Sequence, residues 1–387
     1  MKSLSQRTKL QESGIRRMYD LAKTKQDVIS FVLGEPDFTT PQHIIQAAKR
    51  ALDKGLTHYT DNAGILPLRK AIAGYLAKHD GVTYDPVGEI MVSTGAMEII
   101  YLCFSALLDP GDEVLITDPC YANYYGQISM NNGVPVPVPV YEANGFHFTY
   151  ESMKEHITAK TKAILLNSPC NPTGGVADMA TMESIARIAR EYDLYVVYDA
   201  VYRHFTYEGS RFYNLAALSG MRERTLYVDS FSKTYAMTGW RLGYAAGPRE
   251  IISLLPKLHE FMPSCVPEFL QLGATEALEK GDEDIAAMHQ EYSKRRAILL
   301  DRINGISGLS CRAPGGAFYA FLNIQKTGLS SVEFAERLLT EQGVVVAPGD
   351  AFGAHGEGFV RISYATSIDN IEKGMDRMEK FVKSLLR

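Results

Sequence analysis

The sequence predicts an α/β protein with a large domain, built on a mostly parallel sheet flanked by helices, and a smaller α+β domain. Short apolar runs alternate with stretches of helical periodicity through the middle of the chain. No internal repeat and no linker rich in proline or glycine interrupts that alternation. After about Glu276 the pattern changes to longer amphipathic helices and a few strands. We therefore expect a large domain over residues 45–275 and a small domain formed by residues 1–44 and 276–387.

Four apolar runs indicate strands of the large domain, at residues 113–117, 162–167, 194–199 and 225–229. Runs that are apolar on both faces are typical of a parallel sheet covered on each side. Between the second and third runs, apolar residues from Met182 to Tyr192 repeat at helical spacing. This order predicts a βαβ unit.

The remaining elements follow from the same periodicities. Helices are predicted from Leu66 to His79 and from Gly95 to Leu108, where an Asp-Pro-Gly sequence ends the second one. In the small domain, strands are predicted around residues 317–322 and 359–363. The N-terminal segment is expected to pack against this domain rather than against the central sheet.

Composition excludes several classes of function. The 387 residues carry a formal net charge of -5 and no basic run, so nucleic acid is not an expected partner. No stretch approaches the roughly 20 apolar residues that span a bilayer, and the start of the chain, Met1 to Gln6, lacks the apolar core of a signal peptide. Five scattered cysteines without a CxxC pair predict neither a disulfide framework nor a metal site, and Cys120 and Cys170 are expected to be core residues. We expect a cytoplasmic enzyme.

Unusual polar residues collect where the predicted strands end. The sequence 168–175 follows one strand, Asp199 closes the next with Tyr202 three residues later, and Ser230–Lys233 follow another. Each of these is compatible with ordinary turn chemistry. Ligands in open α/β sheets bind beyond the carboxyl ends of the strands, so the three together predict a functional site.

Lys233 is the most informative of these residues. It is the only charged residue between Asp229 and Arg241, in a run that holds the only tryptophan of the chain. The alternative is a solvated lysine, as most lysines are. A partly desolvated lysine, however, has a lowered pKa and becomes a nucleophile that can bind an aldehyde covalently.

The neighbouring residues match the needs of pyridoxal 5'-phosphate, which has an aldehyde, a phenolic oxygen, a pyridine nitrogen and a phosphate. Asp199 suits the pyridinium nitrogen, although a helix N-cap is its alternative role. Tyr202 and Asn171 can donate to the phenolic oxygen, although Asn171 also suits a turn before Pro172. Tyr121 can stack on the ring, or can simply pack in the core.

The phosphate suits the N-terminus of a helix, where free backbone N–H groups and the helix dipole attract an anion. Gly95, Ala96 and Met97 begin a predicted helix. Ser230, Ser232 and Arg241 can complete the cradle with hydroxyls and a guanidinium. Arg241 alone is also compatible with a structural ion pair.

These motifs resemble those of the class I/II aminotransferases, the fold-type I pyridoxal-phosphate enzymes of the aspartate aminotransferase superfamily. The resemblance is carried by the cofactor-lysine signature Ser230–Lys233 with Thr238–Gly243, and by Gly34–Phe38, Tyr59-Thr60 with Gly64, Asn171–Gly174, Asp199 with Tyr202, Pro314–Tyr319 and Val360–Tyr364. These segments span nearly the whole chain, and together they are highly specific.

The resemblance implies a role for each matching residue. Lys233 would hold the cofactor and then act as the general acid/base for the proton of the substrate α-carbon. Asp199 would pair with the pyridinium nitrogen, Asn171 and Tyr202 with the phenolic oxygen, and Tyr121 would stack on the ring.

The resemblance also implies substrate contacts and a dimer. Arg361 would clamp the substrate α-carboxylate, helped by Asn171 and by the backbone of Gly34. Tyr59 would reach the phosphate of a neighbouring subunit, which implies a homodimer with shared active sites.

The sequence departs from the family pattern in three places. Ala200 stands where many relatives have glutamate, Ala96-Met97 where some carry a hydroxyl or a lysine, and Tyr121 where tryptophan or phenylalanine is common. No residue can be assigned from the sequence to the side-chain carboxylate of a dicarboxylic substrate.

The sequence therefore predicts an aminotransferase that moves an amino group between an L-amino acid (aspartate, aromatic or related) and a 2-oxo acid such as 2-oxoglutarate. The alternative is a C–S β-lyase or another elimination enzyme on the same scaffold, because the fold does not determine which reaction follows. A regulator that only senses pyridoxal phosphate would need an added DNA-binding module, for which we expect no residues to remain.

Overall fold

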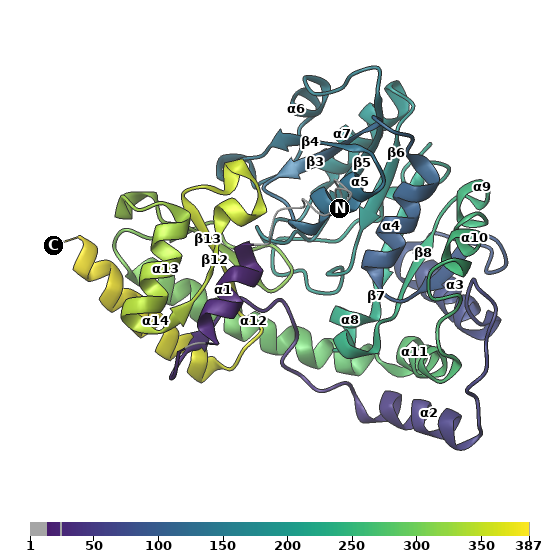
Figure 1. Cartoon of the computed structure of the whole chain (residues 1–387), viewed down its shortest axis with the longest axis horizontal. Coiled ribbons are helices and arrows are strands. Elements are labelled where there is room, and N and C mark those ends of the chain that lie inside the picture. Colours follow the sequence, from purple (N-terminus) through teal and green to yellow (C-terminus); the bar gives the residue numbers. More distant parts are fainter. Residues whose placement is uncertain (1–13, 24, 387) are drawn as a thin grey trace, which may run out of the picture.

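The computed structural model describes residues 14–23 and 25–386. The absence of a signal peptide core, predicted from Met1 to Gln6, lies outside these residues. Figure 1 shows a large lobe and a smaller one, with a long helix, α12 (Asp282–Gly305), running between them.

The large lobe contains a seven-stranded sheet in the order β2-β8-β7-β6-β5-β3-β4. β8 is antiparallel to both of its neighbours, and the other neighbouring pairs are parallel. The strands are β2 (Ile90–Ser93), β3 (Glu113–Asp118), β4 (Val134–Pro139), β5 (Thr161–Asn167), β6 (Tyr195–Asp199), β7 (Thr225–Ser230) and β8 (Gly243–Ala246). The four predicted strands correspond to β3, β5, β6 and β7, which confirms the mostly parallel sheet.

Helices cover both faces of this sheet because the side chains of each strand alternate between two apolar layers. On β6, Val196 and Tyr198 join the layer of α7, whereas Val197 joins the layer of α4. The helices of this lobe are α2 (Gln42–Asp53), α3 (Leu66–Asp80), α4 (Ala96–Leu107), α5 (Asn123–Met130), α6 (Tyr150–Lys154), α7 (Met179–Glu191), α8 (Phe231–Thr234), α9 (Arg249–Ile252), α10 (Leu255–Glu260) and α11 (Glu268–Lys280). The βαβ unit β5-α7-β6 and the helices α3 and α4 are those that the periodicity predicts.

The smaller lobe contains a four-stranded antiparallel sheet in the order β12-β13-β10-β9. Its strands are β9 (Ser310–Cys311), β10 (Tyr319–Asn323), β12 (Ala347–Pro348) and β13 (Phe359–Ser363), and its other helices are α13 (Ser331–Gln342) and α14 (Ile368–Leu385). The N-terminal segment joins this lobe: α1 (Gly14–Ala22) packs against α13 and β12, and β1 (Ile29–Ser30) pairs with β11 (Val344–Val345).

One further expectation, the burial of two cysteines, is confirmed. Cys120 and Cys170 are buried, and all five cysteines are free. Over the described ranges, no helix is both long and apolar enough to cross a membrane, and no group of three or more His, Cys, Asp or Glu side chains is placed to hold a metal ion.

Candidate active site

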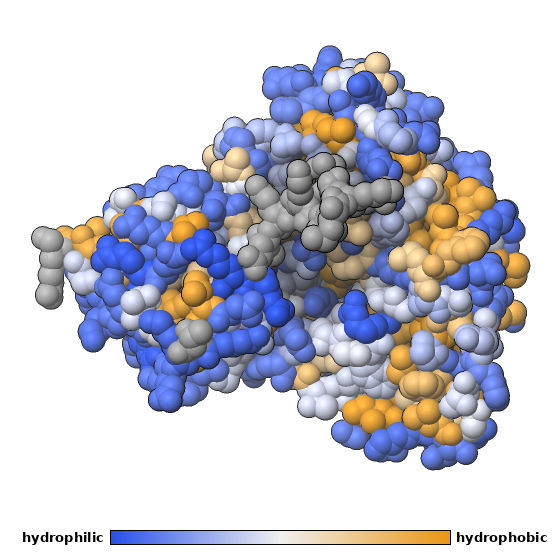
Figure 2. Space-filling view, in the orientation of Figure 1, coloured by the Kyte–Doolittle hydropathy of each residue, from blue (hydrophilic) through white to orange (hydrophobic). Residues whose placement is uncertain are grey.

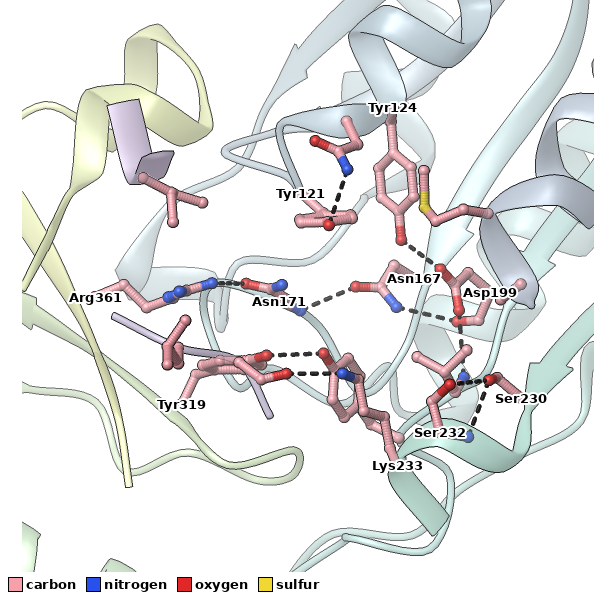
Figure 3. A pocket seen from close by; sticks show the side chains of 18 of the residues that line it. Tyr121, Tyr124, Asn167, Asn171, Asp199, Ser230, Ser232, Lys233, Tyr319 and Arg361 are labelled. Carbon is pink, nitrogen blue, oxygen red and sulfur yellow. Dashed lines mark hydrogen bonds between the residues drawn. The ribbon is translucent and has the colours of Figure 1, made fainter. Parts of the chain in front are cut away.

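A cavity of about 640 Å³ lies at the carboxyl ends of β5, β6 and β7, with residues of the small lobe on its other side. The last residues of these strands, Asn167, Asp199 and Ser230, all line it, as is usual for ligand sites in open α/β sheets. The sequence-predicted residues that line it are Gly34, Ala96, Met97, Tyr121, Asn171, Asp199, Tyr202, Ser230, Ser232, Lys233, Arg241 and Arg361. Figure 3 shows how several of them converge from the two lobes.

Lys233 points into this cavity from the short helix α8. Ser230 caps the helix, since its side chain accepts a hydrogen bond from the backbone N–H of Ser232. The Lys233 ammonium donates to the backbone oxygen of Gly34, with 2.7 Å between Nζ and the oxygen. Burial lowers the pKa of Lys233 to about 8, because a low-dielectric surrounding disfavours the charged amine. Lys233 is therefore not a solvated surface lysine.

Asp199 is a buried carboxylate at the end of β6. One oxygen, Oδ2, accepts from the hydroxyl of Tyr124 at 2.7 Å, and Oδ1 accepts from the N–H of Val201 at 3.2 Å. Burial raises the pKa of Asp199 to about 6, and the bonds from Tyr124 and Val201 limit the rise. At neutral pH the carboxylate is still mostly ionised, so it can hold a cationic ring nitrogen.

Two asparagines link Asp199 to Arg361 through a chain of hydrogen bonds along the cavity wall. Asn167 donates from Nδ2 to the backbone oxygen of Asp199 at 3.1 Å and accepts from the N–H of Asn171 at 2.9 Å. The side-chain oxygen of Asn171 in turn accepts from Arg361 at 2.8 Å. This bond directs the Asn171 NH₂ group away from Arg361, so that it remains a donor.

Arg361, on β13, is a buried cation, with 2% of its surface exposed. Its guanidinium donates to two neutral oxygens, those of Asn171 and of the Val32 backbone. Its Nε has no hydrogen-bond partner among the described residues, and the guanidinium lies 4.6 Å from the ring centroid of Tyr319. Since buried charges are usually paired, this arrangement is that of a site for an anion such as a carboxylate.

Tyr319 also forms a pair with Tyr202, with their hydroxyl oxygens 2.8 Å apart. A Cβ on Gly34 would lie 2.2 Å from the Tyr319 hydroxyl, so only glycine fits between Tyr319 and Lys233. Tyr121 lies across the cavity from Tyr319 (Figure 3). Its hydroxyl accepts from Asn123 at 2.9 Å.

The N-terminus of α4 provides an anion cradle. Gly95 is the N-cap, with φ of 107°, and a Cβ there would lie 2.6 Å from a guanidinium nitrogen of Arg241. Ala96 and Met97 follow it and line the cavity.

The other side of the cradle is made of hydroxyls and one guanidinium. The hydroxyl oxygens of Ser230 and Ser232 lie 2.9 Å apart. Arg241 donates to the backbone oxygen of Thr238 at 3.1 Å and forms no ion pair with any described carboxylate. The structural ion pair considered as its alternative role is therefore not formed.

Two predicted residues do not line the cavity of their own chain. Gly95 stands just behind it as the N-cap of α4. The Tyr59 side chain is 90% exposed and lies outside the cavity.

Sequence reasoning missed several residues that the fold brings to the site. Asn167 closes a predicted strand at the same edge, and Tyr124 follows Tyr121 by three residues, so both had a local signal. Tyr319 lies inside a matched motif but had no assigned role. Ile15, Arg16 and Tyr19 of α1 line the cavity as well, and nothing in their local sequence indicates this.

Comparison with known proteins places the chain in a family. The family described as aminotransferase class I and II matches residues 26–378. An aspartate aminotransferase of Pyrococcus abyssi is 47% identical over 373 residues, and an aromatic-amino-acid aminotransferase of Thermococcus litoralis is 44% identical over 373 residues; each match covers 96% of both chains.

Solved structures agree. The aromatic aminotransferase from Pyrococcus horikoshii has a TM-score of 0.91 at 46% identity, covering 95% of this chain and 99% of that one. The aspartate aminotransferase from Thermus thermophilus with maleate has a TM-score of 0.93 at 36% identity, covering 98% of this chain and 100% of that one. None of these relatives is named as a lyase. A match of this extent shows that the chain belongs to the class I and II aminotransferases of fold type I and is an amino-transferring enzyme.

Proposed function

We propose that the chain binds pyridoxal 5'-phosphate at Lys233 and transfers an amino group between an L-amino acid (aspartate, aromatic or related) and a 2-oxo acid such as 2-oxoglutarate. The observation that carries the proposal is the convergence of three charged groups in one cavity. These are an amine with a lowered pKa, Lys233, a buried carboxylate, Asp199, and a buried guanidinium that pairs with no carboxylate of the described residues, Arg361. The class I and II aminotransferase family depends on this cofactor.

The residues of the cavity fit each part of the cofactor. The Asp199 carboxylate suits the ring nitrogen, and the Tyr202 hydroxyl and Asn171 amide suit the phenolic oxygen. Tyr121 would stack on the flat ring. The phosphate cradle would consist of the N-terminus of α4 after Gly95, formed by Ala96 and Met97, together with Ser230, Ser232 and Arg241.

Bound pyridoxal phosphate supplies an electron-withdrawing ring that makes the α-proton of an amino acid acidic. Lys233 then accepts and returns that proton. A pKa of about 8 suits this role because both protonation states are accessible near neutral pH. Arg361 and Asn171 hold the α-carboxylate, with the Gly34 backbone beside it, so that the α-carbon faces the amine.

A homodimer with shared sites is part of the proposal. Tyr59 is 90% exposed and Phe261 is 88% exposed, and Met262, Leu254 and Leu52 are about half exposed. Figure 2 shows apolar side chains gathered over α3 and α10, and again over α2. A second copy that covers this face would bring its Tyr59 to the phosphate cradle of the first chain. The domain boundaries at residues 44/45 and 275/276 and a cytoplasmic location stay predictions from the sequence.

The test is reduction of the purified enzyme with borohydride followed by peptide mapping, which should place the pyridoxyl group on Lys233. A panel of amino acids is then scored separately for oxo acid exchange and for release of ammonia or thiol. Label on another lysine would overturn the site. Release of ammonia or thiol without exchange would favour the elimination enzyme.

A further inference from the structure

The cavity holds one charged residue that the proposed function leaves unused. Its described lining includes five charged side chains, those of Arg16, Asp199, Lys233, Arg241 and Arg361. The last four are assigned to the cofactor or to the substrate α-carboxylate. Arg16, which α1 brings to the cavity, has no assigned ligand.

Helix α1 is fixed on the small lobe by the side chains that point away from the cavity. Met18 is buried with 2% exposed, and Arg17 forms an ion pair with Glu336 of α13. At its start, a Cβ on Gly14 would lie 2.8 Å from that of Ala351. Figure 1 shows α1, in purple, on the side of the small lobe that faces the large one. This anchoring turns Ile15, Arg16 and Tyr19 towards the cavity.

Arg16 is held loosely enough to change partners. Its Nε donates to Asp20 at 3.0 Å, one turn along the helix, and both side chains are substantially exposed, at 63% and 46%. Exposed pairs of this kind contribute little to stability. Asp20 also accepts from Lys23 at 3.0 Å, so it keeps a cationic partner when Arg16 turns away.

The surroundings of Arg16 suit a substrate side chain. Val32, Leu33, Ile15 and the Tyr19 ring line the same cavity, and they offer apolar contacts to an aromatic or aliphatic side chain. A guanidinium beside them adds a two-point partner for a carboxylate.

We propose that Arg16 binds the side-chain carboxylate of a dicarboxylic amino acid or oxo acid, which takes the place of Asp20, and so sets the preference of the enzyme for acidic substrates. The inference rests on the proposed function and names the substrate class of the same site. Acidic substrates use Arg16, whereas aromatic substrates use the apolar wall beside it.

The experiment compares Arg16→Gln holoenzyme with wild type on aspartate, 2-oxoglutarate and phenylalanine. Loss of one charged hydrogen-bond pair should raise the KM for the two dicarboxylates about tenfold or more, with KM for phenylalanine nearly unchanged. Arg337→Gln is the matched control, because it removes the same charge from an exposed i,i+4 pair with Glu341 on α13 and does not touch the cavity. It should treat both substrate classes alike.

A second variant separates substrate contact from helix stability. Asp20→Asn removes the competing carboxylate, so it should lower the KM for dicarboxylates, whereas damage to α1 would raise it. The proposal fails if Arg16→Gln changes the KM for aspartate and the KM for phenylalanine to the same degree, or changes neither KM.

Binding of inhibitors tests Arg16 without turnover. In calorimetric titrations of the holoenzyme, Arg16→Gln should weaken the binding of succinate and leave the binding of 3-phenylpropionate unchanged. Equal effects on the two affinities would refute the role of Arg16. Failure of the proposed function would show differently, as absence of oxo acid exchange by the wild-type enzyme itself.

Discussion

Replacement of Asp199 by asparagine should stabilise the cofactor-free protein while it weakens cofactor binding. Burial raises the pKa of Asp199 from an ordinary 3.8 to about 6. A carboxyl whose pKa is raised by folding contributes stability that is fully present below pH 3.8 and is lost as the pH rises through 6. Above that range the native state carries a buried charge that the unfolded chain would hold in water.

The size of the effect follows from the pKa difference. About two pKa units correspond to roughly 3 kcal/mol at pH 8 and, because the native carboxyl is then protonated and buries no charge, to roughly 1 kcal/mol at pH 4.5. Asparagine keeps an oxygen for the Val201 N–H and carries no charge. With an unfolding entropy of about 0.8 kcal/mol/K for a chain of this length, Asp199→Asn should raise the melting temperature by roughly 4 °C at pH 8.

The assay is thermal unfolding of the cofactor-free protein at pH 8 and pH 4.5, with titration of pyridoxal 5'-phosphate at pH 8. The control is Asp178→Asn. Asp178 caps α7, and the hydrogen bond from the Thr181 N–H holds the pKa of Asp178 below its usual value. Loss of that charge should therefore destabilise, the opposite sign. The reasoning would be refuted if Asp199→Asn had no higher melting temperature than wild type at pH 8. It would also be refuted if the gain in melting temperature were the same at pH 8 and pH 4.5.

The remaining predictions concern catalysis and assembly. Labelling of the cofactor-free protein at Lys233 by pyridoxal 5'-phosphate should accelerate as the pH rises, with a midpoint near 8, because burial lowers the pKa of this amine; a midpoint near 10.5, its ordinary value, would contradict the burial argument. Arg361→Ala should raise the KM for every amino acid and oxo acid tested, since truncating the buried partner of a carboxylate costs roughly 2–5 kcal/mol, and an effect confined to acidic substrates would place Arg361 at the side-chain end instead. Mixed Lys233→Ala and Tyr59→Ala chains should regain some activity as heterodimers with one intact site, whereas a fully active monomer on sedimentation would argue against shared sites.

Local patterns were sufficient for most of the fold. The strands β5, β6 and β7 are apolar on both faces, and the residues that close them, Asn167, Asp199 and Ser230, lie at one edge of the sheet. Parallel strands bring their carboxyl ends together, so the polar residues after them converge without knowledge of the tertiary structure. The proposal that Lys233 holds the cofactor rests on the same argument and on the resemblance of its motif to that of the family.

The missed features depend on contacts between distant segments. Tyr319 reaches Tyr202 across 117 positions of sequence. Helix α1 lies over the cavity because contacts such as those of Met18 and Arg17 fix it on the small lobe. The strand β4 was not predicted, and the reason is local. Its sequence alternates valine and proline, and proline lacks the N–H that a central strand needs; β4 forms because it stands at the edge of the sheet.

That edge has a consequence for how copies of the chain can associate. The N–H groups of Val134 and Val140 point towards β3, so even-numbered positions face the sheet and Pro135, Pro137 and Pro139 face outwards. The free side of β4 therefore presents carbonyl oxygens but no N–H at these positions. A strand from another copy would find too few backbone N–H donors to form a ladder of hydrogen bonds with β4. The prolines therefore protect the sheet from edge-to-edge aggregation. The backbone of β4 thus prevents copies of the chain from joining their sheets at this edge. Stable contacts between copies must instead be made by side chains on the helices.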